Sequence, residues 1–140
     1  MDKKQEKILE LARSFIDAPY KYGAKPEDIP QYFDCSSFTQ YIYKQINVQL
    51  ERSAILQATQ GQEILDIKNA KTGDLLFFRG SKGHYNDDLF PGKKIYIGHV
   101  AIYSENNMAI HSASPEGVVK ESIDEIMRIR GPIVIIKRIL

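Results

Sequence analysis

The order of two hydrophobic periodicities constrains this chain more than any other feature of its sequence. In the first half, apolar residues recur every three or four positions, which is the spacing of helices with one buried face. From Lys71 onward, apolar residues come in short runs rich in β-branched and aromatic side chains, as in strands. Helices that precede a series of strands favour an α+β fold with an antiparallel sheet.

Capping residues divide the helical half into three predicted helices. Pro19 is expected to stop the first helix, and Asp34 can cap the second by accepting free backbone N–H groups of its first turn. Ser53 can cap a shorter third helix, which Gly61 ends. The three predicted helices span residues 4–16, 35–46 and 54–58. The segment between the first two is predicted to be an ordered loop with at most one helical turn.

The second half predicts five strands and one long loop. Residues 104–107 have the composition of a hairpin turn. Much of residues 79–97 is predicted to be loop, and loops of that length often form lids over active sites. The predicted strands span residues 75–78, 95–103, 108–113, 117–121 and 133–139.

Length and charge limit the class of protein. The 140 residues suit one domain, so we expect a single domain over residues 1–140. The net charge is +1 and basic residues form no stripe, which argues against a nucleic-acid partner. The sequence shows no apolar segment suited to a signal peptide or a membrane span, so we expect a soluble chain without an export signal. The oligomeric state stays open.

The only cysteine is the first candidate for chemistry. An intramolecular disulfide is impossible, and Cys35 directly follows the predicted cap Asp34. The positive end of a helix stabilises a thiolate and lowers the thiol pKa, and the thiolate is the species that attacks a carbonyl. A lone cysteine is also often just a small buried apolar side chain.

Two histidines on one predicted hairpin could serve this thiol. With the turn centred on Glu105, His99 and His111 lie directly opposite each other, with β-carbons about 4.5–5.5 Å apart. His111 could then hold His99 in the tautomer that presents a nitrogen to Cys35. His84 lies in the long loop and is expected to be a surface residue. Residue type alone also allows a zinc site from the cysteine and the histidines, although they include no close-spaced ligand pair.

Six segments resemble, in the same order, the motifs of one known family. Residues 34–38 read Asp-Cys-Ser-Ser-Phe, residues 72–78 Thr-Gly-Asp-Leu-Leu-Phe-Phe, and residues 98–103 Gly-His-Val-Ala-Ile-Tyr. The others are residues 19–23, 51–53 and 110–113. Together they resemble the NlpC family of papain-like cysteine peptidases, which cut the peptide stems of bacterial cell walls. Ser37 and Ala24 stand where the family usually has glycine.

This resemblance implies a fold and a set of site residues. The fold is papain-like α+β, with N-terminal helices packed on a central antiparallel sheet of about five or six strands. Cys35 would be the nucleophile, His99 the base and His111 the third polar residue, and no metal or organic cofactor is implied. The implied groove and oxyanion residues are Tyr20, Asp34, Ser36, Arg52 and Ser53. Tyr20 would donate to the oxyanion, and Asp34 could hold the free amino end of a peptide stem.

The resemblance also implies a reaction. We expect hydrolysis of an amide bond in a peptidoglycan stem peptide or its fragment, most simply a γ-D-glutamyl–diamino acid bond. An amidase, acyl transferase or isopeptidase of the same fold is one alternative. A wall-peptide binding module without catalysis is another. Residues 79–97 are longer than the family's usual link between strands, so they could cover the groove or serve a partner.

Overall fold

A central antiparallel sheet organises the molecule. The computed structural model describes residues 1–81, 83–86 and 88–140. Within them the sheet has six strands in the order β1-β8-β2-β5-β6-β7, and β3 pairs with β4 in a separate small sheet. The strands are β1 Gln62–Glu63, β2 Leu75–Phe78, β3 His84–Tyr85, β4 Tyr96–Ile97, β5 His99–Tyr103, β6 Met108–Ala113, β7 Gly117–Ser122 and β8 Ile133–Arg138. The predicted α+β fold is confirmed.

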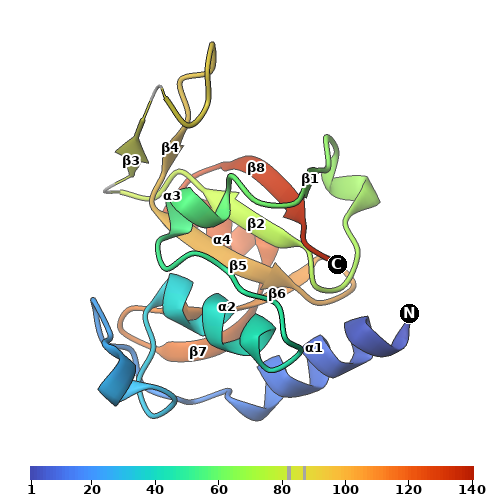
Figure 1. Cartoon of the computed structure of the whole chain (residues 1–140), viewed down its shortest axis with the longest axis vertical. Coiled ribbons are helices and arrows are strands. Elements are labelled where there is room, and N and C mark those ends of the chain that lie inside the picture. Colours follow the sequence, from blue (N-terminus) through green and yellow to red (C-terminus); the bar gives the residue numbers. More distant parts are fainter. Residues whose placement is uncertain (82, 87) are drawn as a thin grey trace.

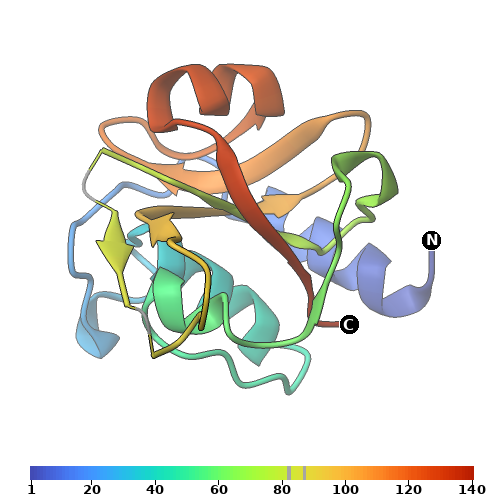
Figure 2. The same ribbon diagram turned by 90° about the horizontal axis from the view of Figure 1, so that it is seen from above.

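Helices cover both faces of this sheet. The α-helices are α1 Lys3–Ser14, α2 Cys35–Lys44, α3 Ala54–Gln57 and α4 Ile123–Arg130, and the 3-10 helices are η1 Pro26–Asp28 and η2 Ile67–Asn69. Figure 1 shows α2 in front of the sheet, and Figure 2 shows α4 on the opposite side of it from α2.

None of the helices in the described part of the chain has the length and apolarity needed to span a membrane.

Alternate residues of the sheet build two cores. Phe77 and Val100 pack with Phe38 of α2, whereas the neighbouring Phe78 and Ala101 belong to a second cluster that contains residues of α4. Because both faces of β2 are buried, this strand consists of four consecutive apolar residues and shows no alternation.

The start of α2 is fixed by two reciprocal hydrogen bonds. Asp34 Oδ1 accepts from the backbone N–H of Ser37 at 2.8 Å, and Ser37 Oγ accepts from the N–H of Asp34 at 2.9 Å. This capping box confirms Asp34 as the N-cap and makes Cys35 the first helical residue. The side chain of Ser37, which stands where the resembled family usually has glycine, therefore supplies one of the two bonds.

The helix predictions need two corrections. The first helix ends at Ser14, before the predicted stop, and Asp17 then adopts a left-handed conformation with φ of 82°. Helix α4 was not predicted, although Ser122 caps it and Ile123 and Ile126 are its buried residues. Its eight residues follow directly on β7, and a segment of about two turns gives only a weak periodic signal.

The predicted strand 95–103 is interrupted at Gly98, which divides it into β4 and β5. The chain of Gly83 crosses so close that a β-carbon at Gly98 would lie 3.1 Å from the Gly83 Cα and 2.9 Å from the Arg79 carbonyl oxygen. Before the break, β4 pairs with β3, so part of the predicted loop 79–97 is a small hairpin that projects from the body in Figure 1. Residues 82 and 87 of the predicted lid lie outside the described residues.

The register of the β5–β6 hairpin differs from the prediction by two residues. Ile102 lies opposite Ile110 and Tyr103 opposite Ala109, which centres the turn on Asn106 instead of Glu105. Asn106 and Asn107 have φ of 53° and 60°, a conformation that asparagine tolerates. Continuing this register places Ala101, not His99, opposite His111. A shift by two keeps every side chain on its predicted face.

A buried ion pair makes one position beside the sheet sensitive to mutation. The carboxylate of Asp74, which is 2% exposed, accepts from Arg138 Nε at 2.9 Å and from its Nη2 at 2.8 Å. Asp74→Ala should lower the free energy of unfolding by about 3 kcal/mol, because it removes the carboxylate that compensates the charge of a partly buried guanidinium. Urea denaturation measures this change.

The control is the exposed pair between Glu125 and Arg128 on α4. Glu125→Ala should leave the urea midpoint nearly unchanged, because water screens that pair. Equal shifts for the two variants would contradict the role assigned to Asp74.

Candidate active site

Cys35 is held at the head of α2 by contacts with the sheet. The carbonyl of Phe33, two residues earlier, accepts from the hydroxyl of Ser112 on β6 at 2.9 Å. The backbone N–H groups of Val100 and Ser36 interact with the Cys35 sulfur and favour its thiolate. Since Val100 directly follows His99, the thiol lies against the first residues of β5.

Burial dominates the protonation of this thiol. Burial raises the pKa of Cys35 to about 11, and the nearby carboxylate of Asp34 raises it further, against the lowering by the two backbone N–H groups and Arg52. The lowering of the thiol pKa expected from the helix end is therefore present but smaller than the effect of burial. Removal from water outweighs the favourable dipole.

The two histidines are in direct contact. His99 Nε2 and His111 Nδ1 are 2.7 Å apart, and the ring centroids are 5.0 Å apart with the planes at 80°. The side chains come from neighbouring strands and are both buried. The rings thus lie on one side of the sheet, as predicted, although they are diagonal rather than direct cross-strand neighbours.

A carboxylate that the sequence reasoning missed lies behind them. His111 Nε2 and Glu121 Oε1 are 2.7 Å apart, and Glu121 comes from β7. Glu121 lies opposite Ala109 in the register, two residues from His111 on the same face. The predicted strand 117–121 ends at Glu121. Placing the turn between this strand and the one before it would have shown that Glu121 can face His111.

The surroundings favour the neutral form of both rings. Burial lowers the pKa of His99 well below its ordinary value, and the neighbouring His111 and Arg130 act in the same direction. Burial also lowers the pKa of His111, while the hydrogen bond and the charge of Glu121 raise it. A neutral imidazole can accept a proton, so His99 is suited to the role of base.

A cleft beside Cys35 gathers the residues implied for the groove. It has a volume of about 290 Å³ and its lining includes Tyr20, Asp34, Ser36, Arg52 and Ser53 together with Cys35. All five candidates therefore meet at one place, although they come from three separate segments. His84 also lines the cleft, which its expected place on the surface did not indicate.

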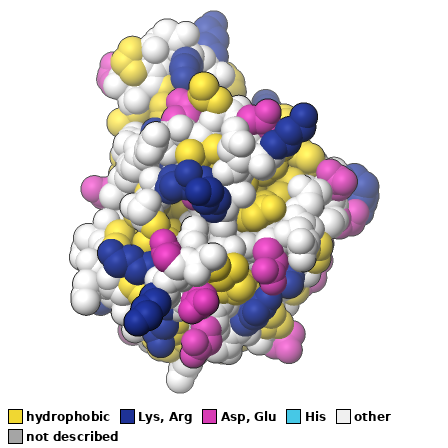
Figure 3. Space-filling view, turned by 90° about the vertical axis from the view of Figure 1, so that its right-hand side faces the viewer, with side chains coloured by type: hydrophobic (Ala, Val, Ile, Leu, Met, Phe, Trp, Pro, Cys, Tyr) yellow, Lys and Arg dark blue, Asp and Glu magenta, His cyan; other side chains and the backbone are white. Residues whose placement is uncertain are grey.

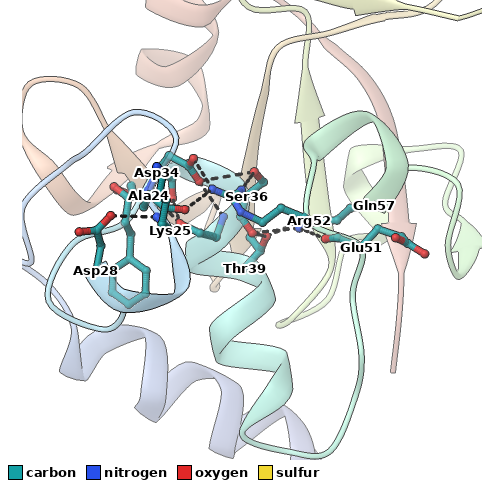
Figure 4. A network of polar contacts seen from close by, with 12 residues as sticks. Ala24, Lys25, Asp28, Asp34, Ser36, Thr39, Glu51, Arg52 and Gln57 are labelled. Atoms are coloured by element: carbon teal, nitrogen blue, oxygen red, sulfur yellow. Dashed lines mark hydrogen bonds and ion pairs between the residues drawn. The ribbon is translucent and has the colours of Figure 1, made fainter.

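Asp34 and Arg52 form the most ordered part of this cleft. Arg52 Nη2 donates to Asp34 Oδ2 at 2.7 Å and to the Ala24 carbonyl at 2.8 Å, and its Nη1 donates to Ser36 Oγ at 2.8 Å (Figure 4). Arg52 is thus more than a surface charge, because it ties the loop at Ala24 to the start of α2. Both oxygens of Asp34 are therefore engaged before any substrate amine arrives, Oδ1 by the Ser37 N–H and Oδ2 by Arg52.

Tyr20 retains its phenolic proton over the working pH range. Burial raises its pKa above the ordinary value, and the charges of Cys35 and Asp34 raise it further. A β-bridge between Tyr20 and Phe33 places the tyrosine beside the segment that leads into Cys35. The hydroxyl can therefore act as a hydrogen-bond donor in the cleft.

The described residues outside the cleft give no sign of a metal site. In the described part of the chain, no three His, Cys, Asp or Glu residues are grouped so as to hold a metal ion, so the zinc alternative gains no support. On the face drawn in Figure 3, basic and acidic side chains are interspersed and no histidine is visible.

Comparison with known proteins identifies the family. The model of the NlpC/P60 family matches residues 17–130, which include Cys35, both histidines and Glu121. The chain belongs to the NlpC/P60 family.

Curated relatives of this NlpC/P60 protein carry enzyme names. It is 31% identical over 115 residues to the probable endopeptidase NlpC of Escherichia coli K12, covering 81% of this chain and 65% of that protein. It is 34% identical over 94 residues to the murein DD-endopeptidase MepS/murein LD-carboxypeptidase of the same strain, covering 66% and 42%. The chain spans less than two thirds of the length of these relatives.

Solved structures agree with the papain-like fold. The NlpC/p60 domain of the peptidoglycan hydrolase SagA superposes with a TM-score of 0.72 at 31% identity, over 96% of this chain and 97% of that one.

The raised pKa of the thiol predicts how Cys35 reacts in the absence of substrate. Alkylation by iodoacetamide should climb about tenfold per pH unit between pH 8 and 10 and level off only near the pKa of about 11. Free cysteine is the control and should level off above about pH 9.5. A rate for Cys35 that is already maximal below pH 7 would show a preformed thiolate and contradict the dominance of burial.

Proposed function

We propose that this protein is a cysteine peptidase that hydrolyses an amide bond in peptidoglycan stem peptides or their fragments. The proposal is supported by a thiol at a helix N-terminus whose sulfur interacts with the backbone N–H of Val100, the residue after His99, and by the hydrogen-bonded pair of buried histidines. A nucleophile, a base and a group that orients the base are the parts that acyl transfer requires.

The residues suit a two-step reaction. The sulfur of Cys35 attacks the amide carbonyl while its proton passes to His99 Nδ1, the ring nitrogen that His111 does not engage. His99 then gives this proton to the leaving amine as the C–N bond breaks, which leaves a thioester on Cys35. Water attacks the thioester, its proton passes to His99, and the carboxylic acid leaves as the thiol recovers its proton.

Two donors can stabilise the negative oxygen that forms during attack. One is the backbone N–H of Cys35, which lies in the first turn of α2 and so has no partner within the helix. The other is the hydroxyl of Tyr20, which lines the same cleft and stays protonated. A donor at the place where charge develops is the most effective use of a hydrogen bond in catalysis.

The substrate class follows from the relatives and the cleft. Relatives of this chain are named as endopeptidases, and one is named for action on murein. Asp34 and Ser36 border the cleft beside the nucleophile and can contact the amino end of a stem peptide. The bond proposed is the γ-D-glutamyl–diamino acid bond. An amidase or acyl transferase acting on another acyl group would use the same residues.

A binding module without catalysis is less consistent with the geometry. Burying two imidazoles is unfavourable in free energy, and binding a peptide does not require it. The hydrogen-bonded pair beside a thiol suits the transfer of a proton from the thiol to His99, which a binding module does not need.

Loss of the sulfur tests the proposal. Cys35→Ala should reduce hydrolysis of muropeptides by at least about 10³-fold, because the thioester can no longer form. Mass spectrometry of the digest identifies the bond through its products. Lys44→Ala, at the other end of the same helix, is the control and should keep full activity. Turnover that survives Cys35→Ala, with the protein pure and folded, would refute the proposal.

Removal of one hydroxyl tests the oxyanion donors. Tyr20→Phe should lower kcat roughly a hundredfold with little change in KM, because the lost bond strengthens only as the carbonyl oxygen becomes charged. Steady-state kinetics on the same stem peptide separate the two constants. A rise in KM at constant kcat would instead assign Tyr20 to substrate binding.

A further inference from the structure

Three neighbouring strands each contribute one side chain to a continuous line of hydrogen bonds. His99 lies on β5, His111 on β6 and Glu121 on β7, and these strands are adjacent in the sheet. Both links are 2.7 Å long. The line therefore runs from the residue beside the thiol to a partly exposed carboxylate, and sequence reasoning accounts only for its first two members.

The carboxylate determines where the protons on the rings lie. A carboxylate can only accept, so His111 Nε2 must donate to Glu121. A neutral imidazole has one N–H, so His111 Nδ1 is left as an acceptor and His99 Nε2 must donate to it. The Nδ1 of His99 is then bare. This is the tautomer in which His99 can take a proton from a thiol.

Charge balance gives the same carboxylate a second role. When His99 accepts a proton, a positive charge appears in a buried place, which is costly unless it is offset. Arg130 at the end of α4 opposes this charge, whereas Glu116 in the β6–β7 turn favours a charge on His111. On the α2 side, the carboxylate of Asp34 supplies negative charge near the Cys35 thiol. In the described part of the chain, Glu121 is the carboxylate that hydrogen-bonds to a ring of the pair.

We propose that Glu121 is a positioning residue of the reaction, which selects the tautomers of both histidines and offsets the charge that His99 gains. This inference rests on the proposed roles of Cys35 and His99. Glu121 acts through His111 and does not touch the substrate.

Glu121→Gln removes the charge but keeps an oxygen that can accept from His111. We expect kcat to fall roughly tenfold with KM within about twofold, because a weaker base transfers the thiol proton less readily. The acid limb of kcat/KM should move to lower pH, since without the carboxylate the imidazole pair binds its proton less tightly. Glu121→Ala also removes the acceptor, so its kcat should be lower still.

Glu116→Gln is the matched control. It removes an equal charge that influences His111, but from an exposed position in the β6–β7 turn without a hydrogen bond to the ring. Its kcat and the midpoint of its acid limb should stay close to those of the wild type. If Glu121→Gln matches this control in both quantities, the inference is overturned.

A direct observation of the protons keeps the test independent of turnover. In the Cys35→Ala background, ¹⁵N NMR of labelled histidine should find the proton of both rings on Nε2, and Glu121→Ala should give a mixture of tautomers. A proton on His111 Nδ1 when Glu121 is present would overturn the inference. Activity that survives Cys35→Ala would instead refute the proposed function, so the two failures are distinguishable.

Discussion

The active-site arrangement depends on how the N-terminus of α2 is held against the first residues of β5. Asp34 is central to this constraint because its two oxygens serve different partners. One caps the helix through Ser37, and the other pairs with Arg52, which in turn binds the loop at Ala24. On the opposite side of the segment, Ser112 fixes Phe33 to β6. The position of Cys35 is thus set from two directions by hydrogen bonds that involve neither the thiol nor a substrate.

The sheet fixes the positions of the two histidines, as the capping interactions fix the position of the cysteine. Strands buried on both faces allow little movement, so side chains on neighbouring strands keep their relative positions. The same burial penalises separated charges, which explains why the pKa of the thiol is raised and that of His99 is lowered. Charge separation in the reaction therefore requires compensation from fixed groups, and the carboxylate behind His111 is suited to supply it.

Local patterns in the sequence predicted much of this arrangement. The cap at Asp34, the strand 75–78 and the fold class all follow from short-range propensity, and each is confirmed. The groove candidates were drawn from family motifs, and the fold brings them together at one cleft. Their roles stay predictions.

The features that were missed depend on register and on crowding between distant segments. A turn that could centre on Glu105 or Asn106 changes the partner of His111, and sequence composition does not distinguish the two. The contact of Glu121 with His111 depends on how neighbouring strands pair, which no local pattern gives. The break at Gly98 arises from the approach of Gly83, which no local pattern encodes.

The central claim, that Cys35 forms a thioester with a stem-peptide carbonyl, is tested most directly by acid-quenching the reaction within its first turnover. The mass of the intact protein should rise by the mass of the acyl portion of the substrate, the added mass should map to Cys35, and hydroxylamine should release it. Turnover with no adduct on Cys35 at any quench time, under conditions where acylation outpaces hydrolysis, would contradict the account.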